Sequence, residues 1–161
     1  MKLIILGSGG YGNTVLDIAE QLGYIIVDIL DDKDEKHPLS SYREYISDDT
    51  EFIVAFGNNE LRLSWCEKIF NDGGKLATLI YPTAYVSPKS TIGMGSVILP
   101  NAVINTGTKV GEGCIVNLGA IIDHDCIIEN GVHVCVGAIV KGNNVIGKCT
   151  KIEAGEIIER G

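Results

Sequence analysis

Residues 98–128 read ILPNAVINTGTKVGEGCIVNLGAIIDHDCII, and every sixth residue from the first one is isoleucine or valine. The same register runs without exception from Ile80 to Ile158. Its fourteen members are Ile80, Val86, Ile92, Ile98, Ile104, Val110, Val116, Ile122, Ile128, Val134, Val140, Ile146, Ile152 and Ile158. A period of six differs from the turn of an α-helix and from the two-residue alternation of a flat strand. It predicts a hexapeptide β-solenoid, in which each unit is one short strand followed by a corner.

The residue four places after each aliphatic is mostly small. These positions hold Ala84, Ser90, Ser96, Ala102, Thr108, Cys114, Ala120, Cys126 and Ala138, with Val132 as the larger exception. We expect three units to close a triangular coil of about 18 residues, with the aliphatic and small side chains pointing inward. Stacking of the coils would then bury each valine or isoleucine, which contributes roughly 1.5–3 kcal/mol. Asn144, Thr150 and Glu156 take the small position in the last repeats, which is the kind of departure expected of a cap.

Composition limits the possible functions of this chain of 161 residues. Its net charge of −8 argues against a nucleic-acid surface, which needs clustered lysine and arginine. We find no apolar stretch long enough for a membrane span and no charged leader with a cleavage site, so we expect a cytoplasmic protein. The cysteines are odd in number and lack CxxC spacing, which favours neither a disulfide framework nor a zinc site. They are Cys66, Cys114, Cys126, Cys135 and Cys149.

The first 79 residues follow a different pattern, in which strands and helices alternate. The expected strands are residues 2–6, 24–30, 52–56 and 75–80, and the expected helices follow Gly12 and cover about 41–46 and 60–70. The apolar face expected of the last helix consists of Leu61, Trp65, Ile69 and Phe70. This order predicts a small α/β domain with a parallel sheet over residues 1–79, followed by the all-β solenoid over residues 80–161.

Three loops at the carboxyl ends of the predicted strands are candidates for a ligand site, because ligands of parallel sheets bind there. They are Gly7–Gly12, Asp31–Lys33 and Gly57–Asn59. The first satisfies GxGxxG between a strand and a helix, whose free amides favour a phosphate, and an acidic pair about 20 residues later can hold ribose hydroxyls or a base edge. The loops predict nucleotide binding, with a purely structural tight turn as the alternative. NAD is disfavoured because the domain is about half the size of a dinucleotide fold.

His124 is the strongest candidate for a catalytic group. It stands between Asp123 and Asp125 at a predicted corner, where the carboxylates would orient the ring and stabilise its charged form. Gly142, one coil of about 18 residues later, should stack on His124 and could offer its amide to an oxyanion in acyl transfer. No Ser-His-Asp set or GxSxG motif is present, so direct attack on a thioester fits better than a covalent acyl-enzyme. An exposed histidine without a role is the alternative, and a metal site is disfavoured because no second histidine has ligand spacing.

These motifs together resemble one known family, the nucleotide-sugar acetyltransferases that join an N-terminal Rossmann-like domain to a C-terminal left-handed β-helix. The family includes the UDP-4-amino-sugar N-acetyltransferases of the bacillosamine pathway and the sialic-acid O-acetyltransferase-like proteins. The resemblance covers nearly the whole chain. It rests on the glycine loop, Asp31-Asp32, the GNNELR segment at 57–62, Asn117 and His124-Asp125-Cys126.

The resemblance implies a role for each motif. The residues that would hold the UDP-sugar are Gly9, Gly10, Tyr11, Gly12, Asp31, Asp32, Lys33, Gly57, Asn58 and Asn59. His124 would be the general base, with Asp125 tuning it. Asn117, His133 and Gly142 would contact acetyl-CoA. The resemblance further implies a homotrimer that uses acetyl-CoA as co-substrate. From the composition and the residue spacing above, we expect no metal, nucleic acid or membrane partner.

Three functions are open at this point. The first is N-acetylation of a UDP-linked amino sugar, and the second is O-acetylation of a sugar hydroxyl by the same base. The third is a non-catalytic, trimeric nucleotide-binding module. The sequence does not separate the first two, because an amine and a hydroxyl would both lose a proton to the same histidine.

Overall fold

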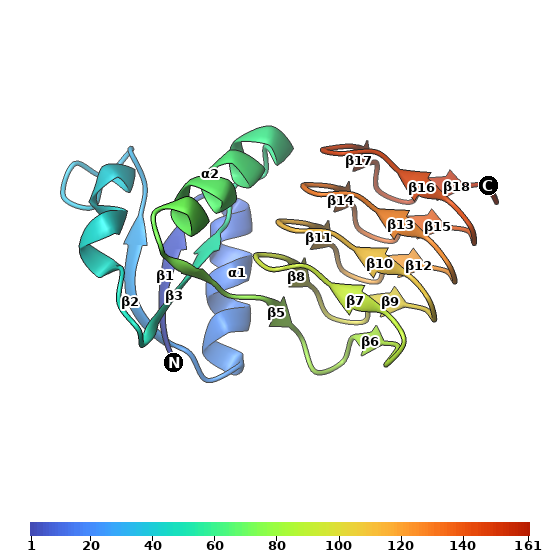
Figure 1. Ribbon diagram of the computed structural model, residues 1–161, viewed down its shortest axis with the longest axis horizontal. Helices are drawn as coiled ribbons and strands as arrows, with labels where there is room; N and C mark the ends of the chain where they lie inside the picture. The colour runs from blue at the N-terminus through green and yellow to red at the C-terminus, as the bar shows by residue number, and fades with distance from the viewer. The chain divides into compact units, whose positions relative to one another are not determined.

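The computed structural model describes all 161 residues (Figure 1). The chain divides into two compact units, Met1–Leu79 and Ile80–Gly161, because most contacts lie within one unit or the other. The first unit alternates strands and helices along the chain. Its elements are β1 (Lys2–Leu6), α1 (Gly10–Gln21), β2 (Ile25–Leu30), the 3-10 helix η1 (Leu39–Tyr45), β3 (Thr50–Val54), α2 (Asn59–Asn71) and β4 (Lys75–Leu76). The four strands form one parallel sheet in the order β2-β1-β3-β4. The predicted small α/β domain is therefore present.

The sheet of the first unit is covered on both faces, so its central strands are apolar throughout. Every residue of β1 after Lys2 is buried. Side chains of β1 and β3 on one face, including Ile4 and Phe52, pack with η1 and α2. Successive side chains of a strand point to opposite faces, so Leu3 and Ile5 face the other layer. Helix α1 contacts β1 and β2 and supplies that layer.

The buried face of α2 differs from the prediction. Leu61 and Phe70, expected in the core, are 46% and 55% exposed. The buried residues are Arg62, Leu63, Cys66 and Ile69. One helical face contains Arg62, Cys66 and Ile69, which are three or four residues apart. A pattern based on apolar side chains places an arginine on the surface, so it did not predict this face. The prediction failed because the guanidinium of Arg62 is buried among hydrogen-bond acceptors.

The predicted strand 75–80 is also divided. Lys75 and Leu76 form β4, which pairs with β3, whereas Leu79 and Ile80 form β5, which belongs to a sheet of the solenoid. The other solenoid strands are β6 (Tyr85–Val86), β7 (Thr91–Ile92), β8 (Val97–Ile98), β9 (Val103–Ile104), β10 (Lys109–Val110), β11 (Ile115–Val116), β12 (Ile121–Ile122), β13 (Ile127–Ile128), β14 (His133–Val134), β15 (Ile139–Val140), β16 (Val145–Ile146), β17 (Lys151–Ile152) and β18 (Ile157–Ile158).

The second unit is a parallel β-helix with three sheets (Figure 1). Their strand orders are β16-β13-β10-β7, β17-β14-β11-β8-β5 and β18-β15-β12-β9-β6. Lys109 pairs with Ile127 and Ile115 with His133, so each strand lies against the residues one predicted coil away. The aliphatic row from Ile98 to Ile152 forms one buried core with small residues such as Cys114 and Cys126, and Val86, Ile92 and Ile158 are partly buried against it. Ile80, which was expected to be buried, is exposed because it lies at the open end of the row. The fold prediction, including the coil length that places every corner, is confirmed.

At the small position of the last repeats, Asn144 and Thr150 form hydrogen bonds with backbone carbonyls. The Asn144 side-chain amide donates to the carbonyls of Lys141 and Glu159, at 2.7 Å each. The Thr150 hydroxyl donates to the carbonyl of Gly147 at 2.6 Å. The strands therefore continue in register to β18 although the small residue is absent.

Candidate active site

The first unit contains a cavity of about 630 Å³ at the carboxyl ends of β1, β2 and β3. Its lining comprises Gly7, Gly9, Gly10, Tyr11, Asp31, Asp32, Lys33, Leu39, Ala55, Phe56, Gly57, Asn58, Leu61 and Trp65. The structure thus brings the three predicted loops together around one space. Of the ten residues expected to hold a nucleotide sugar, only Gly12 and Asn59 are outside the lining.

Gly12 and Asn59 build the walls of the cavity. A Cβ atom at Gly12 would collide with the carbonyl oxygen of Gly7, so only glycine lets the first turn of α1 pack this closely on the loop that follows β1. Gly7 itself has a φ of 112°, a conformation that favours glycine. Asn59 accepts a hydrogen bond from the guanidinium of Arg62 through its side-chain oxygen.

The two acidic residues after β2 have different surroundings. The Ser8 amide and hydroxyl both donate to Oδ2 of Asp31 at 2.8 Å, and the Lys33 amide donates to its Oδ1 at 3.0 Å. These bonds, led by that from Lys33, lower the pKa of Asp31. Asp32 accepts one bond, from the amide of Leu39 at 3.0 Å. Asp31 therefore ties the glycine loop to the loop after β2, and Asp32 is the freer acceptor for a ligand.

Replacing Asp31 with asparagine should weaken binding of a nucleotide such as UDP by about tenfold, because charge-assisted bonds that join two walls of the cavity are lost. Isothermal calorimetry measures the affinity. Asp34→Asn is the matched control, since Asp34 accepts from Lys36 in the same loop but does not line the cavity. Equal affinities for the two variants would contradict the tie between the loops.

The sequence prediction missed the apolar half of the cavity. Leu39, Ala55, Phe56, Leu61 and Trp65 were not expected in the lining, and Leu61 and Trp65 were expected in the core of α2. The Trp65 ring packs edge-on against Tyr42, with centroids 5.5 Å apart, and Lys68 Nζ lies 4.3 Å from the Trp65 centroid. An apolar residue on the first turns of a helix that follows a glycine-rich loop is a signal that could have found Leu61. The cavity combines polar loops with an apolar wall, as a ligand with a charged part and a planar part requires.

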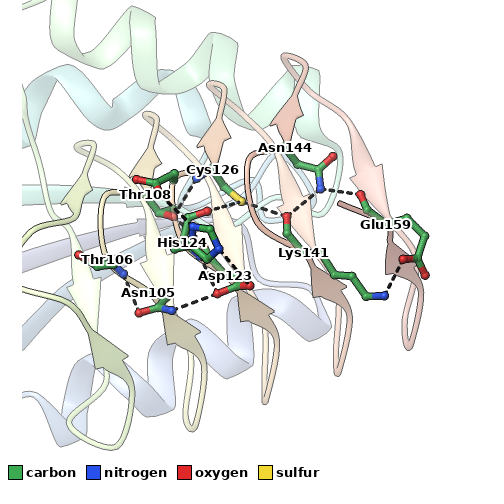
Figure 2. Close-up of polar contacts among 10 residues, drawn as sticks. Asn105, Thr106, Thr108, Asp123, His124, Cys126, Lys141, Asn144 and Glu159 are labelled. Atoms are coloured by element: carbon green, nitrogen blue, oxygen red, sulfur yellow. Dashed lines mark hydrogen bonds and ion pairs between the residues drawn. The ribbon is translucent and has the colours of Figure 1, made fainter. Parts of the chain in front are cut away.

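His124 occupies a corner of the β-helix between β12 and β13 (Figure 2). Its Nδ1 lies 2.8 Å from Oδ2 of Asp125, and its Nε2 lies 3.9 Å from Oδ2 of Asp123. The side chain of His124 is 34% exposed. Asp125 has a φ of 56°, in the left-handed region. The imidazole is thus oriented through one nitrogen and open to solvent, and this geometry suits a general base.

Neighbouring coils fix the Asp123 carboxylate beside this ring. Asn105 donates to Oδ1 of Asp123 at 3.0 Å, and the His124 amide donates to the same oxygen at 2.7 Å (Figure 2). The bond from Asn105 is the largest cause of the lowered pKa of Asp123, and the amide of Gly142 contributes to it. Asn105 was not predicted. Its position one coil before Asp123 is the signal that could have identified it.

The backbone of the corner is fixed from the preceding coil as well. The Thr108 hydroxyl donates to the carbonyl of Asp123 at 2.6 Å and accepts from the amide of Cys126 at 3.1 Å (Figure 2). Burial raises the pKa of the Cys126 thiol, which keeps this cysteine in its neutral form. The corner that presents His124 therefore has little freedom to move.

Gly142 packs against the imidazole, as the coil length predicts. A Cβ atom at this position would lie 2.6 Å from Nε2 of His124. The Gly142 amide donates a hydrogen bond to the Asp123 carboxylate. The sequence had suggested that this amide would bind an oxyanion, but in the structure its partner is Asp123. Asn117 and His133 are the other residues expected to contact acetyl-CoA. Asn117 directly follows β11 and His133 belongs to the neighbouring strand β14, and their Nδ2 and Nε2 atoms lie 3.0 Å apart.

The structure was also searched for metal-binding groups and for membrane-spanning helices. No group of three or more histidine, cysteine, aspartate or glutamate side chains is placed to hold a metal ion. Neither helix has the length and apolar character needed to cross a bilayer.

Comparisons with known proteins identify relatives of both units. Residues 2–69 match the family described as the PglD N-terminal domain. Over 110 residues the chain is 28% identical to the UDP-N-acetylbacillosamine N-acetyltransferase of Bacillus subtilis (strain 168). That match covers 60% of this chain and 50% of the relative, so the chain spans about half the length of this curated protein.

Solved structures extend the similarity to the β-helix. The acetyltransferase domain of PglB from Neisseria gonorrhoeae FA1090 is 38% identical, with a TM-score of 0.88, over 97% of this chain and 81% of that one. The same domain is known in complex with acetyl coenzyme A. PerB from Caulobacter crescentus, in complex with CoA and GDP-perosamine, is 25% identical, with a TM-score of 0.83, over 99% of this chain and 89% of that one. The matching N-terminal domain, the shared β-helix and the level of identity show that the chain belongs to the nucleotide-sugar acetyltransferases.

Proposed function

We propose that this protein transfers the acetyl group of acetyl-CoA to the amine of a UDP-linked amino sugar, with His124 as the general base. The observation that carries the proposal is the His124 corner. Asp125 engages Nδ1 and leaves Nε2 as the nitrogen that faces a reactant. With the proton of the neutral ring on Nδ1, Nε2 can accept the proton of the attacking amine.

The chemical step balances with the groups at this corner. The amine nitrogen attacks the thioester carbonyl carbon while Nε2 of His124 takes the amine proton, and a tetrahedral intermediate forms. Its C–S bond then breaks, which releases the CoA sulfur, and the proton held by His124 returns to that sulfur. Asp125 holds the imidazole in the required tautomer, and the fixed charge of Asp123 stabilises the imidazolium. A side chain at position 142 would collide with the imidazole, so glycine there leaves Nε2 unobstructed.

The cavity of the first unit is proposed to bind the nucleotide. Helix α1 begins at Gly10 without a side-chain cap and without an acidic residue in its first turn, so its amides and positive dipole end suit a diphosphate. Asp32 offers a carboxylate oxygen to the base or ribose, and Trp65 and Leu61 offer an apolar wall. The name of the Bacillus subtilis relative supports UDP as the nucleotide, whereas the PerB complex makes GDP the alternative.

The predicted homotrimer fits the surface of the solenoid. Large apolar side chains are exposed on several of its strands and turns, as is expected where chains associate. They include Leu118, Ile121, Ile127, Val136, Val145 and Ile157. The cytoplasmic location stays a prediction from the sequence.

A thiol-release assay with acetyl-CoA tests the proposed function. The acceptors are a UDP-linked 4-amino sugar, its GDP-linked counterpart and the corresponding hydroxy sugars. We expect CoA release only with the amino sugars and faster release with UDP. Turnover of the hydroxy sugar alone would favour O-acetylation. Calorimetry that detects UDP binding without acetyl-CoA binding would favour the non-catalytic module.

A further inference from the structure

Arg62 is the largest of the fully buried side chains, with 1% of its surface exposed. Burial of an arginine is costly unless its donors are satisfied, so its partners identify what the side chain holds in place. Arg62 lies in the first turn of α2, immediately after the loop that closes the cavity from the β3 side. No role was predicted for it from the sequence.

The guanidinium fastens this loop to the helix. Nη1 of Arg62 donates to the carbonyl of Phe56 and Nη2 donates to Oδ1 of Asn59, both at 2.9 Å. The backbone amide of Arg62 donates to the carbonyl of Asn58 at 2.9 Å, and Asn58 caps α2 by accepting from Leu61 at 2.8 Å. One side chain therefore spans the segment Phe56–Asn59, three residues of which line the cavity.

Arg62 also interacts electrostatically with Tyr11, which lines the cavity on the side of α1. Burial raises the pKa of the Tyr11 hydroxyl, and the positive charge of Arg62 opposes that rise. Tyr11 is in the first turn of α1 and lines the cavity. Its hydroxyl is the one buried side-chain polar atom without a hydrogen-bond partner. The guanidinium is thus in contact with the wall after β3 and within electrostatic reach of the wall at α1.

We propose that Arg62 is the positioning residue that holds the Phe56–Asn59 wall in the shape that binds the nucleotide sugar. The inference rests on the proposed function of this cavity and adds the residue that organises it. The planar fork of arginine reaches two acceptors in a fixed geometry, which the single ammonium of lysine does not reproduce. Affinity for the nucleotide sugar, rather than the rate of acetyl transfer, should therefore depend on the fork.

The test compares Arg62→Lys with Leu63→Ala in the full-length protein. Arg62→Lys keeps the charge and removes the fork, and should raise KM for the nucleotide sugar about tenfold, with kcat and KM for acetyl-CoA within about threefold of the unchanged protein. Leu63 is 2% exposed, next to Arg62, and belongs to the core. Leu63→Ala should lower the melting temperature and leave that KM unchanged. If Arg62→Lys does not fold, Asn59→Ala removes one acceptor of the fork and should raise KM about threefold.

An unchanged KM in Arg62→Lys would overturn the proposal, and so would an equal rise in Leu63→Ala, because loss of core packing would then explain the effect. Calorimetry with UDP alone separates this outcome from failure of the proposed function. UDP binding that weakens in Arg62→Lys supports the positioning role even if the unchanged protein transfers no acetyl group. Acetyl transfer with equal UDP affinity in both proteins refutes the positioning role and leaves the function intact.

Discussion

Replacing His124 with alanine should lower kcat for acetyl transfer by about 10²–10⁴-fold, which is the range that a positioned general base contributes. The loss is expected because Nε2 is the nitrogen left free by Asp125, and the corner offers no second histidine to replace it. Steady-state release of CoA measures the change. The affinity for UDP should stay within about twofold, since the nucleotide cavity lies in the other unit.

Asp125→Asn gives the matched comparison for this prediction. Asparagine can still contact Nδ1 of His124 but carries no charge to hold the ring in the tautomer with its proton on Nδ1. We expect kcat to fall about tenfold or more, less than in His124→Ala. Both variants should melt within a few degrees of the unchanged protein, because His124 and Asp125 are partly exposed at a turn. Full activity in His124→Ala would show that another group takes the proton.

The register of the β-helix explains why so much of the second unit was predictable. A coil that slips by one residue would expose the aliphatic row, so the position of one strand determines all the others. This constraint is enough to predict from the sequence that His124 lies at a corner and that Gly142 packs against it. The same reasoning would have placed Asn105 beside Asp123, because they are one coil apart.

The first unit was less predictable because its polar side chains hydrogen-bond to groups that no repeat in the sequence indicates. The pattern of apolar residues put Leu61 in the core of α2, yet Arg62 takes that position, since the carbonyl of Phe56 accepts from its guanidinium. A sequence pattern contains no information on such an acceptor. Asp31 is a similar case: the sequence identified it as a ligand-binding carboxylate, and the structure shows that Ser8 and Lys33 occupy its oxygens.

Replacing Gly142 with alanine should reduce acetyl transfer by about 10²-fold without unfolding the protein. The new Cβ would lie 2.6 Å from Nε2 and 2.9 Å from Cε1 of His124, well inside a normal contact, so the imidazole must move. A displacement of about 1 Å at a reacting group can cost this much in rate. The backbone at Gly142 has no positive φ, so alanine adds no backbone strain and the loss is confined to the site.

Gly147→Ala is the control that isolates this effect. Gly147 is another solenoid glycine without a positive φ, and the nearest atom to its added Cβ is Oγ1 of Thr150, at an ordinary contact distance of 3.8 Å. We expect full activity and an unchanged melting temperature in Gly147→Ala, and a folded but nearly inactive protein in Gly142→Ala. If the two variants were equally active, the position of the His124 imidazole would not control the rate of acetyl transfer. The assignment of His124 as the general base would then be contradicted.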